Sequence, residues 1–154
     1  MPTNILRKVP KQSVKPRSPV SAADRIAILT AGRAPPIRLQ LSATETAAIV
    51  WRSLPLFSTA ETWGECVHFE VPVECRRDRT AKLNGETSEV YFWTEDDRII
   101  VPFGPTAISR AGEIRLPRPC NLWAVALDDV RALIDVTPGE KVSLAAAIQR
   151  RGES

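Results

Sequence analysis

The chain has 154 residues, of which 44% are apolar and 25% charged, as is usual for one globular domain. This composition excludes a wholly disordered chain and a collagen-like fibre. The sequence has no run of about 18 apolar residues, which is the length that a helix needs to cross a membrane. One histidine and three cysteines at unrelated spacings indicate neither a metal cluster nor a disulfide framework. We expect no metal, no cofactor, no membrane contact, and three free thiols in a cytoplasmic protein.

The net charge of +3 is unevenly distributed along the chain. Residues 1–25 carry six basic side chains and one acidic one, a net charge of +5, which leaves −2 for the remainder. The same segment contains four prolines and only scattered apolar residues, which cannot offset the entropy lost on ordering. We therefore predict a disordered basic arm at residues 1–24 and a folded domain at 25–149. A non-specific solvated extension is the favoured interpretation of the arm. Contact of its cations with nucleic acid or an anionic surface, and targeting, are the alternatives.

The first part of the folded domain predicts a hairpin followed by a helix. Apolar residues alternate with other residues over 25–30 and 37–41, with Gly and Pro between the two runs, which is typical of antiparallel strands. The string Ser42-Ala-Thr-Glu45 fits a capping box at a helix N-terminus. Apolar residues at helical spacing follow it and Pro55 ends the pattern, so a helix is expected near 43–54.

The rest of the chain predicts mainly strands. Strands are expected around 67–71, at 90–93 paired with 98–101, at 121–127, and from 141 to about 147, where alanines could also support a short helix. Asn84-Gly85 is a strong turn signal, and residues 128–134 could form a short helix. About seven closely spaced strands with one or two short helices predict a mainly β fold, a compact barrel.

Several strings, taken in order, resemble a known family. They are Trp63-Gly64-Glu65, Phe69-Glu70-Val71-Pro72, Val90-Tyr91-Phe92-Trp93, Phe103-Gly104-Pro105-Thr106, and Asn121 at the start of an apolar run. The chain resembles the cyclophilin-like barrel family of small bacterial and archaeal proteins, which is distinct from true cyclophilins. The resemblance covers about residues 25–147. It implies a closed barrel of about eight strands with a small helix at one end, and it brings no agreed substrate.

One alternating strand carries residues that could do chemistry. Cys66, His68 and Glu70 would share one face of it. They could form a metal half-site or a Cys–His pair, a solvent-facing or pocket-wall row, or part of the ordinary packing. Zinc ligands must converge, and a nucleophile needs its base within about 2.6–3.2 Å, so the row is the favoured interpretation. We assign no catalytic residue.

Aromatic residues make up only 6% of the chain, yet most lie within or near the matched strings. One interpretation is a concave apolar site with a few polar groups, the usual make-up of a ligand pocket; the other is that the aromatics fill a barrel interior. The predicted ligand-binding residues are Trp63, Glu65, Tyr91, Trp93, Phe103, Thr106 and Asn121.

These observations favour a binding module that holds a small molecule or a peptide segment. The alternatives are a peptidyl-prolyl isomerase, by analogy of fold, and a structural or scaffold partner of other proteins. True cyclophilins carry a Phe-His-Arg run and a Gly-Gly-Asp string, and neither occurs here. Because a fold does not carry a function without its site, binding is the leading hypothesis.

Overall fold

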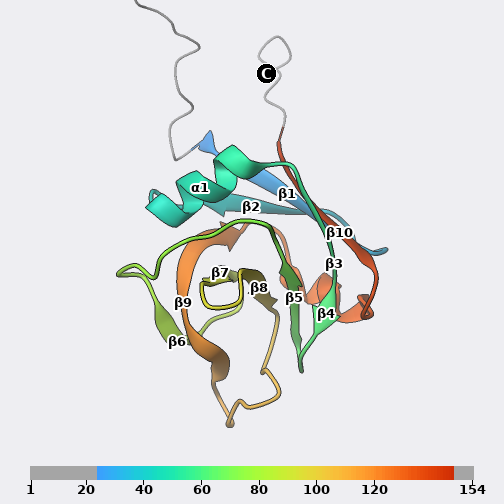
Figure 1. Ribbon diagram of the computed structural model, residues 1–154. Coiled ribbons are helices and arrows are strands. Elements are labelled where there is room, and N and C mark those ends of the chain that lie inside the picture. The colour runs from blue at the N-terminus through green and yellow to red at the C-terminus, as the bar shows by residue number, and fades with distance from the viewer. Residues whose placement is uncertain (1–23, 148–154) are drawn as a thin grey trace, which may run out of the picture.

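The computed structural model describes residues 24–147, which form a mainly β structure (Figure 1). The predicted arm lies outside the described residues except for residue 24. The elements are β1 (Ile26–Ala31), β2 (Ile37–Leu41), α1 (Glu45–Ser53), β3 (Leu56–Thr59), β4 (Glu61–Thr62), β5 (Cys66–Glu70), β6 (Lys82–Gly85), β7 (Glu89–Trp93), β8 (Arg98–Pro102), β9 (Ile114–Ala126), the 3₁₀ helix η3 (Val130–Asp135) and β10 (Lys141–Ala146).

All the strand pairs are antiparallel and form one strongly curved sheet. Its order is β3-β10-β1-β2-β9-β7-β8-β5-β4, and β6 pairs with β9 beside this path. The curvature brings β3 close to β5, where the Ser58 hydroxyl donates a hydrogen bond of 2.6 Å to the carbonyl of Glu70. The result is a nearly closed barrel, in agreement with the predicted fold class.

The inside of the barrel is filled by apolar side chains. Strands β1 and β2 alternate buried and more exposed residues as predicted. Phe69, Phe92 and Trp123 are at most 1% exposed and occupy the same core. Each large apolar side chain removed from water stabilises the fold by about 1.5–3 kcal/mol. These aromatic rings therefore fill the barrel, as one of the two interpretations proposed.

Helix α1 lies across the upper end of the curved sheet in Figure 1. Its buried Ala47 and Val50 join the barrel core. The predicted capping box is wrong: the cap is Thr44, whose hydroxyl accepts the hydrogen bond of the Ala47 amide. Ser42 instead donates its hydroxyl to the carbonyl of Trp123 at 3.0 Å. A tertiary contact with β9 thus takes the hydroxyl that a local cap would use.

A second correction concerns Asn84-Gly85, which lies inside β6 and is not a turn. Asn84 pairs with Arg115 and Gly85 with Ile114 of β9. A Cβ atom on Gly85 would lie 2.7 Å from the hydroxyl of Tyr91. Glycine is required here because a ring packs against the backbone. The chain reverses after it, where Ser88 has a φ of 76°.

The outer face of the sheet carries a small core of its own. It consists of Cys66, Tyr91, Ile100, Leu116 and Cys120, all at most 2% exposed. Their neighbours along the strands, such as Val67 and Phe92, belong to the barrel interior, so these residues point the opposite way. Half-buried Trp93 packs against this outer core, and the candidate site lies beside it.

Candidate functional site

A cleft of about 300 Å³ opens on the outer face of β4, β5, β7 and β8. We call it the Trp63–Trp93 cleft. Its lining residues are Glu61, Trp63, Cys66, His68, Trp93, Asp96, Arg98, Ile100 and Pro117. The two tryptophans are half-buried, whereas Cys66 and Ile100 are buried beneath the cleft. The cleft thus offers partly exposed aromatic surface over an apolar floor.

Strand register explains why these residues meet. His68 of β5 is the partner of Glu61 on one side and of Ile100 on the other. Arg98 of β8 is the partner of Trp93 in β7. Because residues directly opposite each other point to the same face of a sheet, four strands bring their side chains to one patch.

Arg98 organises the polar part of the cleft. Its Nε donates to Asp96 Oδ2 at 2.7 Å and its Nη1 donates to Glu61 Oε2 at 3.1 Å. Nη1 also lies 3.3 Å from Nδ1 of His68. The side chain is only 16% exposed. Among the described residues Nη2 makes no hydrogen bond or ion pair, unlike Nε and Nη1.

His68 is held in its neutral form. Burial, followed by the positive charge of Arg98, lowers its pKa from the ordinary value, and the carboxylates of Glu61 and Asp96 oppose this only in part. Because Nδ1 faces a cation that can only donate, we assign the proton to Nε2. With His68 neutral, one arginine and two carboxylates give this group a net charge of −1.

The lowered pKa of His68 gives a prediction that can be measured on one signal. Since it is the only histidine of the chain, its Cε1 proton is the sole imidazole resonance to titrate. We expect a midpoint below the unfolded value of about 6.5. The histidine binds its proton less readily when folded, so stability should rise with pH up to about 6.5 and level off above it.

A matched variant isolates the cause of this shift. Arg98→Met removes the nearby positive charge and should move the His68 midpoint upward, while Arg38→Met, at an exposed ion pair with Asp128, should leave it unchanged. A wild-type midpoint at or above 6.5 would show that neither burial nor Arg98 governs this imidazole.

The seven residues predicted from the sequence do not share one site. Trp63 and Trp93 line the cleft described above. Glu65 and Phe103 border a second hollow of about 370 Å³. The remaining three, Tyr91, Thr106 and Asn121, are at most 5% exposed. The structure thus places two predicted residues together in the cleft.

The three buried residues have structural partners. Asn121 accepts a hydrogen bond from the amide of Asp78 and donates to the hydroxyl of Thr46 and the carbonyl of Arg76. The hydroxyl of Tyr91 accepts from the Glu86 amide and donates to the Glu89 carboxylate. Thr106 donates to the carbonyl of Arg115. Their polar groups are satisfied within the protein.

Two of the strings behind the family resemblance, Trp63-Gly64-Glu65 and Phe103-Gly104-Pro105-Thr106, pack against each other. Glu65 donates its amide to the carbonyl of Pro105, and Phe103 donates its amide to the carbonyl of Glu65. A Cβ atom on Gly64, which has a φ of 64°, would lie 2.6 Å from the amide nitrogen of Ala107. Gly64 thus permits a close approach of the two loops, which is a structural role.

Sequence reasoning missed Arg98, Glu61 and Asp96 as members of the site. The predicted hairpin of 90–93 with 98–101 contained the necessary signal, since its register sets Arg98 opposite Trp93. Glu61 could not be found in this way because β4 has only two residues. Neither local pattern nor composition marks so short a strand.

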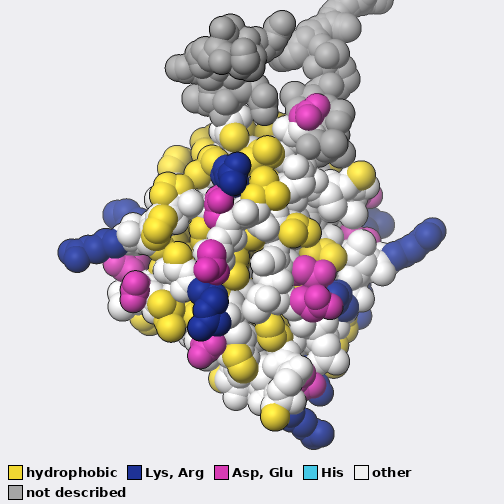
Figure 2. Space-filling view, turned by 180° about the vertical axis from the view of Figure 1, so that it is seen from behind, with side chains coloured by type: hydrophobic (Ala, Val, Ile, Leu, Met, Phe, Trp, Pro, Cys, Tyr) yellow, Lys and Arg dark blue, Asp and Glu magenta, His cyan; other side chains and the backbone are white. Residues whose placement is uncertain are grey.

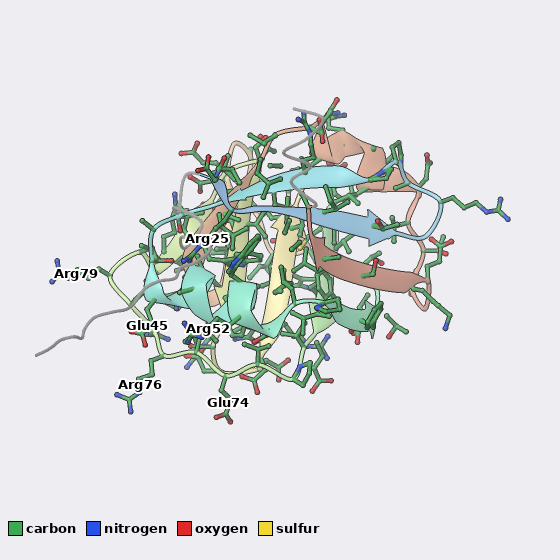
Figure 3. The ribbon with its side chains drawn as sticks, turned by 90° about the horizontal axis from the view of Figure 1, so that it is seen from above. Arg25, Glu45, Arg52, Glu74, Arg76 and Arg79 are labelled. Atoms are coloured by element: carbon green, nitrogen blue, oxygen red, sulfur yellow. The ribbon has the colours of Figure 1, made fainter. Side chains whose placement is uncertain are left out.

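A wider hollow of about 610 Å³ lies between α1 and residues 74–78. Glu45 lies at the start of the helix, and Glu74, Arg76 and Arg79 extend outward from the neighbouring loop (Figure 3). Its lining is dominated by charged side chains, several of them solvent-exposed. The face in Figure 2 likewise intersperses acidic and basic side chains and shows no extended patch of one sign.

The thiols do not supply a reactive group to the cleft. All three cysteines are free. Burial raises the pKa of Cys66 and of Cys120 to about 12, so both remain protonated and poorly nucleophilic at neutral pH. Within residues 24–147 no three side chains of His, Cys, Asp or Glu are placed to hold a metal ion. The same part of the chain has no helix long and apolar enough to span a membrane.

Comparison with known proteins identifies the family. Residues 24–145 match the family model described as Cyclophilin-like. The chain belongs to the cyclophilin-like family. The solution structure of the hypothetical protein AF2241 from Archaeoglobus fulgidus is similar over 80% of this chain and 95% of that one, with 25% identity and a TM-score of 0.68.

A more distant similarity supports the same fold. The structure of McbB in complex with tryptophan matches 83% of this chain and 45% of its own length, with 18% identity and a TM-score of 0.52. No curated protein matches the chain. The cyclophilin-like family thus accounts for the barrel, and the cleft has to be interpreted from its own residues.

Proposed function

We propose that this cyclophilin-like protein is a binding module that holds a small molecule or a peptide segment in the Trp63–Trp93 cleft. The observation that carries the proposal is the pairing of partly exposed tryptophans with a half-buried, pre-organised arginine. A ligand that covers the rings would gain about 25 cal/mol for each Å² of apolar surface removed from water. Arg98 Nη2 would fix its orientation, in the manner of pockets that combine apolar walls with a few polar groups.

Arg98 and the polar side chains around it need little rearrangement to bind a ligand. Asp96 already contacts Nε of Arg98, and Glu61 and His68 contact its Nη1. A side chain fixed before binding loses little conformational entropy when the ligand arrives. The lining also favours binding over covalent catalysis, since its cysteine, Cys66, is protonated and buried.

The test uses the four tryptophans as reporters. Each indole N–H gives one signal in a ¹⁵N–¹H spectrum, and single Trp→Phe variants assign them. The probes are phenylalaninamide, N-acetylphenylalaninamide, phenylalanine and isobutylamine, each titrated to 10 mM. We expect at least one probe to move the signals of Trp63 and Trp93 while those of Trp51 and Trp123 stay in place.

Substitutions then test whether the cleft is the binding site. Trp63→Ala should lower the affinity for the tightest-binding probe about tenfold, which corresponds to roughly 1.4 kcal/mol. The control is Phe57→Ala, which removes a ring that is 73% exposed and lies outside the cleft. If no probe moves the two signals, or if Trp63→Ala leaves the affinity unchanged, the proposal is wrong.

A further inference from the structure

We propose that the Trp63–Trp93 cleft selects an α-amino amide: a protonated amine next to a neutral amide carbonyl, with an apolar side chain. The free N-terminal residue of a peptide has this chemistry. The inference rests on the proposed function and names the class of ligand that the cleft takes.

The preference for a cation follows from the carboxylates. Glu61 and Asp96 each use one oxygen to accept from Arg98, through Oε2 and Oδ2 respectively. Within the described part of the chain, Glu61 Oε1 and Asp96 Oδ1 accept no hydrogen bond. Both side chains are about half exposed, 53% and 50%. A primary ammonium group could therefore donate charge-assisted hydrogen bonds to these oxygens.

The preference for a neutral carbonyl follows from the charge around Arg98. Two carboxylates already surround its guanidinium, and neutral His68 adds no positive charge. A ligand carboxylate at Nη2 would place a third negative charge beside one positive charge, and like charges at such short range repel. An amide oxygen accepts the same N–H groups without that repulsion.

The preference for an apolar side chain follows from the remaining walls. Trp63, Trp93 and Pro117 line the rest of the cleft, with Ile100 as the floor. A volume of about 300 Å³ is at the lower limit for small-molecule pockets, which suits one residue better than a long peptide. Tryptophan faces also attract a nearby ammonium group.

The experiment compares three probes that differ in a single group, at pH 7 and low salt. Phenylalaninamide carries both the amine and the amide. N-acetylphenylalaninamide lacks the positive charge, and phenylalanine replaces the amide by a carboxylate. Affinities are measured from the indole signals of Trp63 and Trp93. We expect phenylalaninamide to bind about tenfold more tightly than either relative.

Two variants locate the source of the preference. Glu61→Gln combined with Asp96→Asn keeps an oxygen acceptor at each position but removes both charges, so it should abolish the tenfold preference for phenylalaninamide over its N-acetyl form. Asp135→Asn removes one exposed carboxylate on η3 and should change neither affinity. If the double variant does not fold, the wild-type protein provides the second measurement: affinity for phenylalaninamide should fall as pH rises through the pKa of its amine, while that for the N-acetyl form stays constant.

Each other result overturns a specific statement. Equal or tighter binding of N-acetylphenylalaninamide contradicts the cation preference, and tightest binding of phenylalanine contradicts the neutral carbonyl; in both cases the binding-module proposal stands. If none of the three probes perturbs the two indole signals while isobutylamine does, the amide class is wrong. If no probe perturbs them, the proposed function fails as well.

Discussion

Replacement of Trp123 by alanine should lower the free energy of unfolding by about 3–5 kcal/mol, the cost typical of removing a buried aromatic side chain. Trp123 lies in β9, is fully buried, and is the largest such side chain in the described core. Domains of this size are stable by only about 5–15 kcal/mol, so the loss is a large share of the total. Urea denaturation of wild type and variant measures it directly.

Two control variants separate the stability lost through the cavity from any effect of removing the indole N–H. The Nε1 atom of Trp123 is buried and has no hydrogen-bond partner within residues 24–147. Trp123→Phe removes this donor and leaves a smaller cavity, so it should cost less than half as much as alanine. Trp63→Ala, at a half-buried ring of the cleft, should also cost less. A Trp123→Ala variant within 1 kcal/mol of wild type would contradict the packing described above.

Replacement of Asn121 by alanine is expected to cost about 2–4 kcal/mol and to loosen residues 76–80. The side chain is fully buried. It accepts from the Asp78 amide at 2.9 Å and donates to Thr46 Oγ1 and the Arg76 carbonyl at 2.9 and 2.8 Å. Alanine leaves these partners unsatisfied, and each buried group without a partner costs roughly 1–3 kcal/mol.

Hydrogen exchange distinguishes this role from ordinary packing. Amides in the 76–80 segment should lose protection in Asn121→Ala, while those of β1 and β10 should lose protection only as far as global stability falls. A double-mutant cycle with Thr46→Val should be non-additive because the two side chains share a hydrogen bond. Additive costs, or unchanged exchange at 76–80, would show that Asn121 does not anchor this loop.

Much of the fold could be predicted from local pattern. The hairpins of β1 with β2 and of β7 with β8 follow from alternation and turn residues, which act over a few neighbouring positions. Thr44 and Asn84-Gly85 show where this reasoning stops. The hydroxyl of Ser42 contacts β9, and Gly85 packs under the ring of Tyr91. The Ser42 contact depends on a partner far away in the sequence. Gly85 is placed by its pairing with Ile114 of β9 together with the nearby ring of Tyr91.

The candidate site was predicted only in part for the same reason. Two of its aromatic residues were found because tryptophans are rare and lay in the family strings. The assignment of Tyr91, Thr106 and Asn121 to a pocket required knowledge of burial, and all three proved to be satisfied inside the protein. Period-two alternation tells which residues share a face, but not what covers that face.

By itself, the sequence determined that the chain forms a mainly β barrel, because the spacing of apolar residues fixes strand and helix periods locally. Only the tertiary structure decided which side chains meet on the outer face. The cleft depends on register across four strands, which brings Glu61, His68, Trp93 and Arg98 together from separate segments. The local pairs of β4 with β5 and of β7 with β8 meet only because β5 pairs with β8, and no local preference of the chain encodes that pairing.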